Sequence, residues 1–146
     1  MSLGSLPSRI LEKHPMIAEP KWITPQIAHA VHSRQIAEHG GQDGLRDEGL
    51  LLSALARPQQ LLSYGSPPPD LCALAAAYAY GIAKNHPFLD GNKRTAFVVY
   101  RLFLKWNGIE LLAEKTQRYV TMLALAAGEI SEEDFATWLR ANTSSE

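Results

Sequence analysis

The residues of this chain that are suited to chemistry gather in one polar stretch, residues 86 to 94, between its two most apolar segments. This stretch contains His86, and histidine is the residue type whose unperturbed pKa, about 6.5, suits a general base working near neutral pH. Asp90 follows and offers a carboxylate that can hold a magnesium ion against phosphates. A base, a metal-binding carboxylate and a site for anions are most of what the transfer of a phosphoryl or nucleotidyl group to a hydroxyl requires, and this stretch offers the first two.

The four residues after Asp90 are suited to holding phosphates. Gly91 lets a ligand approach the backbone closely, and Asn92 adds a side-chain amide. Lys93 supplies a point charge, and Arg94 supplies a planar fork that matches phosphate oxygens. If a helix begins here, the unpaired amides of its first turn and its dipole attract anions as well.

The same stretch also has a purely structural interpretation. It can be an ordinary turn between two helices, in which Asp90 caps the second helix and Phe88 anchors the turn in the core. Lys93 and Arg94 would then be solvated. Composition alone does not separate this interpretation from the functional one.

A helix is predicted on each side of the stretch. Apolar residues between Leu71 and Ile82 recur at helical spacing, and Pro87 should end that helix by forcing His86 into an extended backbone. Asp90 is a good N-cap for a second helix that reaches about Trp106.

The second of these helices is predicted to be central. Of residues 96 to 106 only Arg101 and Lys105 are polar, and a helix so apolar is normally buried. With Arg94, these two residues form a cationic stripe at helical spacing. A DNA-binding regulator that docks through this stripe is one alternative function, although a buried helix cannot enter a groove. A metal-dependent phosphohydrolase using His86 and Asp90 is another.

The sequence His86-Pro87-Phe88-Leu89-Asp90-Gly91-Asn92-Lys93-Arg94 resembles the signature of the Fic superfamily, and Lys93 in place of a second glycine resembles its Doc (death on curing) branch. The resemblance extends from about residue 22 to 140. Further segments that resemble the branch in the same order are Trp22-Ile23-Thr24, His32, Gly40-Gly41, Gly44-Leu45-Arg46-Asp47, Leu52-Ser53-Ala54-Leu55-Ala56-Arg57-Pro58, and Ala126-Ala127-Gly128-Glu129-Ile130-Ser131 with Trp138.

The resemblance implies an all-α, compact bundle of about six helices. It also implies a short flap, often a β-hairpin, before the central helix pair, in which Leu61 and Leu62 would contact a target protein. Within the site it gives His86 the role of catalytic base and Asp90 that of magnesium ligand, while residues 91 to 94 would bind phosphates.

The function implied is ATP-dependent transfer to a protein hydroxyl. Members with this lysine resemble kinases that phosphorylate a threonine of elongation factor Tu, and they act as toxins restrained by a Phd-like antitoxin. Classical Fic proteins transfer AMP instead. Because Pro87 and Gly91 match the classical pattern, adenylyl transfer (AMPylation) stays the alternative.

The other elements follow from caps and breakers. Thr24-Pro25 should begin a helix that Gly40-Gly41 ends. Asp47 should cap a helix that reaches Arg57, where Pro58 closes it, and residues 59 to 69 contain too many breakers for a helix. Two more helices are expected at residues 114 to 127 and after Ser131, with a frayed tail from Asn142.

Two smaller hypotheses concern polar residues before the site. Arg46 and Asp47 are expected to form an ion pair that supports their loop. His29, His32 and His39 can share a helix face, but no cysteine or acid completes a metal site, so hydrogen-bonded histidines are expected.

The totals bound the remaining possibilities. With 146 residues and 46% hydrophobic content, one domain is expected at residues 21 to 146 after a partly disordered extension at 1 to 20. Within that extension Glu12 has the spacing of a Fic inhibitory motif, which Lys13 breaks. The net charge of -1 gives no general reason to bind nucleic acid or membrane. A single cysteine, Cys72, and no signal peptide fit a cytoplasmic protein.

Overall fold

The computed structural model describes residues 19–145. They form six helices, which confirms the all-α prediction, and one small two-stranded antiparallel sheet. The proposed inhibitory Glu12 and most of the expected N-terminal extension lie outside the described residues. The elements are α1 (Pro25–His39), α2 (Glu48–Tyr64), α3 (Leu71–Asn85), α4 (Asn92–Trp106), β2 (Ile109–Leu111), α5 (Lys115–Ala126), α6 (Glu132–Ala141) and β3 (Thr143–Ser145).

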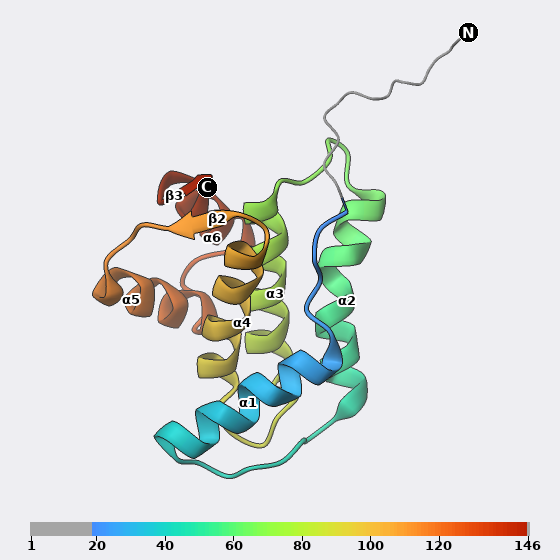
Figure 1. Cartoon of the computed structure of the whole chain (residues 1–146), viewed down its shortest axis with the longest axis vertical. Coiled ribbons are helices and arrows are strands. Elements are labelled where there is room, and N and C mark those ends of the chain that lie inside the picture. Colours follow the sequence, from blue (N-terminus) through green and yellow to red (C-terminus); the bar gives the residue numbers. More distant parts are fainter. Residues whose placement is uncertain (1–18, 146) are drawn as a thin grey trace, which may run out of the picture.

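The helix α3 lies at the centre, packed against α2, α4 and α6 (Figure 1). Every residue from Leu74 to Ala79 is buried, because most of them are alanines that let neighbouring helices approach from several sides. At Gly81 an added Cβ would lie 3.2 Å from the Cα of Ala54, tighter than an ordinary contact, so the glycine lets α2 and α3 pack closely at this point. The helix α1 crosses the end of the bundle where α3 turns into α4 (Figure 1).

The predicted caps are present at three helices. The Thr24 hydroxyl accepts from the amide of Ile27, and the Asp47 carboxylate accepts from that of Leu50. Ser131 forms a capping box with Asp134. Gly40 ends α1 with a φ of +82°, a conformation that glycine adopts without strain. The starts of α1, α2 and α6 are therefore encoded locally.

The predicted end of α2 at Pro58 is wrong. The helix continues to Tyr64, so the described chain forms no hairpin between residues 59 and 69. Pro58 is buried on the face that also buries Leu51, Ala54 and Leu55, and Leu61 and Leu62 extend this face against the core. Burial of these side chains outweighs the one backbone hydrogen bond that a proline removes.

The prediction of a frayed tail is also wrong. Residues Thr143–Ser145 pair in antiparallel fashion with Ile109–Leu111, and Leu112 donates to the carbonyl of Asn142 at 2.7 Å. The short polar segment has none of the alternating apolar pattern that predicts a strand. Its pairing partner comes from more than thirty positions earlier in the chain.

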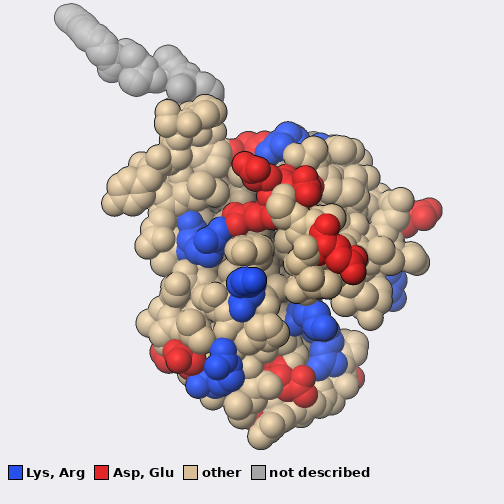
Figure 2. All heavy atoms as spheres, turned by 180° about the vertical axis from the view of Figure 1, so that it is seen from behind, with Lys and Arg blue, Asp and Glu red and all other residues tan. Residues whose placement is uncertain are grey.

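The surface carries both signs of charge. On the face in Figure 2, lysine and arginine atoms are interspersed with aspartate and glutamate atoms and form no continuous basic surface. In the part of the chain that the structure describes, no helix combines the length and the apolar character needed to cross a membrane.

Candidate active site

His86 lies at the junction between α3 and the loop to α4, with an exposed side chain. Its backbone is left-handed, with φ +50° and ψ +57°, so the predicted extended conformation is wrong. The reason is that His86 acts as the C-cap of α3 and donates its amide to the carbonyl of Ile82 at 3.2 Å. A positive φ is strained for a residue other than glycine, and such strain is typical of functional positions.

Arg46 holds this strained junction in place. Its Nε donates to the carbonyl of His86 at 2.7 Å, and its Nη2 donates to the carbonyl of Asn85 at 2.8 Å. A cation at the end of a helix also complements the helix dipole. Among the described residues Arg46 forms no ion pair with Asp47, so the expected pair is wrong, because both side chains bind backbone groups instead.

The loop between α1 and α2 runs beside the candidate site. The amides of Arg46 and Asp47 donate to the carbonyl of Pro87 at 2.7 and 3.0 Å, and Leu89 donates to the carbonyl of Gly44 at 3.0 Å. Leu45 and Phe88 form an isolated β-bridge. The turn that carries the catalytic candidates is thus fixed by a segment about forty positions earlier.

The side chain of Asn92 closes the turn from within. Its Oδ1 accepts from the amide of Phe88, and its Nδ2 donates to the carbonyl of Phe88, both at 2.9 Å. Asn92 is 7% exposed and Phe88 1%, so both are structural anchors of the turn. The side-chain amide of Asn92, which was expected to bind a phosphate, is therefore already hydrogen-bonded to Phe88. Only the backbone N–H of Asn92 is available to a ligand.

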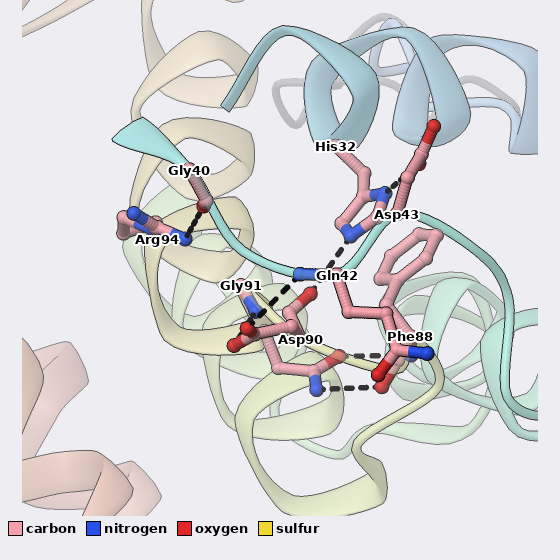
Figure 3. A network of polar contacts seen from close by, with 9 residues as sticks. His32, Gly40, Gln42, Asp43, Phe88, Asp90, Gly91 and Arg94 are labelled. Carbon is pink, nitrogen blue, oxygen red and sulfur yellow. Dashed lines mark hydrogen bonds and ion pairs between the residues drawn. The ribbon is translucent and has the colours of Figure 1, made fainter. Parts of the chain in front are cut away.

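Asp90 is held by backbone donors. Its carboxylate accepts from the amide of Gln42 at 3.2 Å and from that of Gly91 at 2.8 Å (Figure 3). These two bonds, with the charge of Arg94, hold the pKa of Asp90 below its usual range. Gly91, with φ +75°, is the N-cap of α4, so the expected capping role of Asp90 is wrong.

His32 supports the same loop from α1. Its Nε2 donates to the carbonyl of Asp90 at 2.8 Å, and its Nδ1 lies 3.9 Å from the carboxylate of Asp43 (Figure 3). The ring is 2% exposed and stacks on Phe88 with centroids 3.8 Å apart. A hydrogen-bonded histidine was expected, but its partner was not, because 58 positions separate His32 from Asp90. No cluster of three metal-binding side chains occurs in residues 19–145.

His86 and the start of α4 share one cleft of about 290 Å³. No backbone carbonyl in the described chain accepts from the first-turn amides of Asn92, Lys93 and Arg94. Lys93 is exposed, and Arg94 is half-buried with its Nη2 on the carbonyl of Gly40 at 2.9 Å. The cleft therefore joins an imidazole to an electropositive helix start. Its lining consists of His86, Leu89, Asp90, Gly91, Asn92, Lys93 and Arg94.

The cleft suits a magnesium ion that is bound by one carboxylate together with the phosphates of a ligand. Asp90 is the one carboxylate among the lining residues, and its oxygens keep further lone pairs beyond the two backbone bonds. Magnesium is usually bound by one or two carboxylates together with phosphates and waters. The donor set suits an ion that arrives with a nucleotide.

Comparison with known proteins agrees with this geometry. The model of the Fic/DOC family matches residues 22–104. "Protein kinase doc" of Escherichia phage P1 is 35% identical over 118 residues, which are 81% of this chain and 92% of that protein. "Toxin Doc" of Mycolicibacterium smegmatis is 44% identical over 75 residues, which are 51% of this chain and 58% of that protein.

A helical bundle with a polar turn between its two central helices, opening into a cleft, is thus the class of protein that the fold and the site define. The chain belongs to the Fic/DOC family, and its relatives place it in the Doc branch. The resemblance carried by residues 86 to 94 is confirmed.

Proposed function

We propose that this protein is a Doc-type toxin kinase, which transfers the γ-phosphoryl group of ATP to a hydroxyl of a protein substrate. The observation that carries the proposal is the shared cleft, in which the exposed His86 faces the unpaired amides at the start of α4. The relative named "Protein kinase doc" supports the choice of phosphoryl transfer.

In this proposal each residue of the cleft has one task. The amides of residues 92 to 94 and the side chains of Lys93 and Arg94 hold the phosphates, as expected for donors fixed before the substrate arrives, and Gly91 lets the phosphates approach the backbone. Asp90 holds magnesium, which would neutralise charge on the phosphates when bound. The hydroxyl oxygen forms a bond to the γ-phosphorus while the bond to the β–γ bridging oxygen breaks. The hydroxyl proton passes to the imidazole of His86, and ADP leaves.

The proposed target is a threonine of a translation factor similar to elongation factor Tu, and the proposed regulator is a Phd-like antitoxin. The relative named "Toxin Doc" supports a toxin and antitoxin pair. Contact between the target and Leu61 or Leu62 stays a prediction. Both side chains are half-buried against the core on α2, so only their outer edges are offered to a partner.

Adenylyl transfer is the second candidate, because Pro87 and Gly91 follow the classical Fic pattern. A DNA-binding regulator has less support. Val99, Tyr100, Phe103 and Leu104 of α4 are buried, and the face in Figure 2 mixes charges of both signs.

The deciding experiment supplies ATP labelled at either the α or the γ position to the protein with purified elongation factor Tu or a bacterial lysate. We expect γ label on a protein acceptor. The matched variants are His86→Asn, since asparagine tolerates a positive φ, and His39→Asn at the exposed end of α1. Loss of the base should lower the rate by about 10²- to 10⁴-fold, and His39→Asn should not lower it.

Three outcomes would contradict parts of the proposal. Incorporation of the α label instead would assign adenylyl transfer. No incorporation of either label would remove the transferase assignment. Equal rates for the two histidine variants would remove His86 as the base.

A further inference from the structure

A second cleft, of about 460 Å³, opens where α4, α5 and β2 meet, and it shares no residue with the candidate active site. Three of its lining side chains are cations: Arg101 and Lys105 on α4, and Arg118 on α5. Glu110 on β2 is the one acid of the lining. The cleft is therefore cationic in a protein whose net charge is -1.

The arginines of this cleft differ from all the others in residues 19–145. The side chains of Arg101 and Arg118 donate no hydrogen bond to any described residue, whereas the side chain of every other described arginine does. Those partners are Glu38 for Arg34, the Asn85 and His86 carbonyls for Arg46, Glu132 for Arg57, the Gly40 carbonyl for Arg94 and Asp70 for Arg140. The two guanidinium groups without a hydrogen-bond partner in the described chain therefore line the same cleft.

The polar groups here are also poorly satisfied by the protein. The Nε of Arg118 is buried and has no hydrogen-bond partner within the described chain. Burial and the neighbouring charge of Arg118 lower the pKa of Arg101. Glu110 is exposed and forms no ion pair with the three cations in the described part of the chain. Buried donors without acceptors are costly, which an arriving anion would relieve.

Structural roles explain only part of this arrangement. The Arg101 guanidinium lies over the ring of Phe97, 5.1 Å from its centroid. Lys105 lies in the last turn of α4, where a cation complements the dipole. Neither contact gives the N–H groups an acceptor, and neither involves Arg118.

We propose that this cleft is a binding site for a phosphate monoester group, held by the forks of Arg101 and Arg118 and by the charge of Lys105. Planar forks bind phosphate oxygens in pairs. Glu110 offsets one of the three positive charges of the cleft, and a phosphate dianion would offset the other two. The apolar residues Val98, Leu102, Ile109 and Leu111 also line the cleft and would contact the organic part of the ester. This site does not depend on the proposed kinase activity.

The test is an NMR titration of the full-length protein with inorganic phosphate, AMP and phosphoserine, each against chloride at equal ionic strength. The side-chain Nε–H signals of Arg101 and Arg118 report this cleft, and the backbone amides of residues 91 to 94 report the candidate active site. We expect both arginine signals to shift and saturate. Tighter binding of AMP than of phosphoserine would assign a nucleotide, and the reverse would assign a phosphorylated side chain. Equal affinity for all three would assign the bare phosphate group.

Variants make the test sharper. Arg101→Gln and Arg118→Gln should each weaken binding at this cleft by about tenfold, the loss of a charge-assisted hydrogen bond. Arg34→Gln, on the exposed face of α1, is the matched control and should leave the affinity unchanged. Two glutamine variants are used so that a folding defect in one leaves the other informative.

The two proposals fail in different ways. Arginine signals that do not move, while amides 91 to 94 do, would overturn the second site and leave the kinase proposal intact. Arginine signals that shift while those amides stay still would support this site and weaken the kinase proposal. Phosphate affinity that is the same in wild type and in both glutamine variants would also overturn the site.

Discussion

The two ends of α4 use similar residues in opposite ways. At the N-terminal end Arg94 is tied to the carbonyl of Gly40, and the side chain of Asn92 is tied to the backbone of Phe88. Toward the C-terminal end the side chains of Arg101 and Lys105 donate to no residue in the described chain. The groups at one end are held by hydrogen bonds before a ligand arrives, while the other end relies on side chains that are still unpaired.

This difference separates a site for chemistry from a site for binding. Fixed backbone amides need no reorganisation when charge develops in a transition state, so they favour catalysis. Long unpaired side chains must be ordered by the ligand, and that ordering offsets part of the binding free energy. We therefore expect the N-terminal cleft to be sensitive to small distortions of its turn, and the C-terminal cleft to tolerate them.

The largest predicted effect on the free energy of unfolding concerns the two asparagines at the ends of α4. Asn92 bonds both backbone groups of Phe88, and Asn107, the C-cap of α4, bonds both backbone groups of Lys21. Asn92→Ala would leave two buried groups unpaired and should lower the free energy of unfolding by about 3 kcal/mol. Asn107→Ala should lower it by about 1 kcal/mol, because Lys21 is exposed and water can replace the lost bonds.

Urea denaturation of the two alanine variants and the wild type measures this difference. Transferase activity should fall with Asn92→Ala, even at temperatures where that variant is folded, and should persist with Asn107→Ala. An Asn107 variant as destabilised as the Asn92 variant would show that the turn before α4 is no more rigid than the helix end.

The next effect tests the support of the N-terminal end by the α1–α2 loop. Arg46→Lys keeps the charge but replaces two nitrogens of a planar fork by one, which cannot reproduce the geometry of both bonds to the carbonyls of Asn85 and His86. It should lower the free energy of unfolding by about 1 kcal/mol, since the bonds are exposed, and should lower kcat by roughly tenfold by releasing His86. Arg34→Lys, whose partner is Glu38 on the same helix, is the control and should change neither. Unchanged kcat in Arg46→Lys would mean that His86 keeps its position without the fork.

The parts of this molecule that were predictable from sequence are those governed by neighbours along the chain. Caps at Thr24, Asp47 and Ser131 and the apolar spacing of α3 are local signals, and the structure confirms them. The prediction that Pro58 ends α2 was wrong, although a proline inside a helix does cost a backbone hydrogen bond. Burial of Pro58 with Leu61 and Leu62 outweighs that cost.

The contacts that shape the site are long-range and left no local pattern. His32 reaches the Asp90 carbonyl from 58 positions away, and Arg46 reaches the His86 carbonyl from 40 positions away. Both residues belong to segments that resemble the family. The resemblance therefore singled them out but did not predict which backbone carbonyls they bind. The left-handed backbone of His86 follows from that same distant fork and from its place at the end of α3.

The smallest predicted effect compares carboxylates at the two ends of α4 as the pH changes. Backbone bonds from Gln42 and Gly91 hold the pKa of Asp90 below the usual value, so the folded state favours the ionised form. A depressed pKa contributes stability that is fully present above about pH 4 and is lost as the pH falls through the folded-state value. Wild type should thus be more stable than Asp90→Asn at pH 7, and the gap should shrink toward pH 3.

Because Asp90 is fully exposed, solvent screens this contribution and the gap should be smaller than the Arg46 effect. Glu110→Gln at the other end is the comparison at pH 7, where it should change the free energy of unfolding less than Asp90→Asn does, since Glu110 is exposed and no described residue donates a hydrogen bond to its carboxylate. Urea midpoints at pH 7, 5 and 3 measure both. A gap for Asp90→Asn that is as wide at pH 3 as at pH 7 would mean that the amide side chain alters the turn itself. In that case the rigidity of the N-terminal end would come from the Asn92 and Arg46 contacts, without a share from the charge of Asp90.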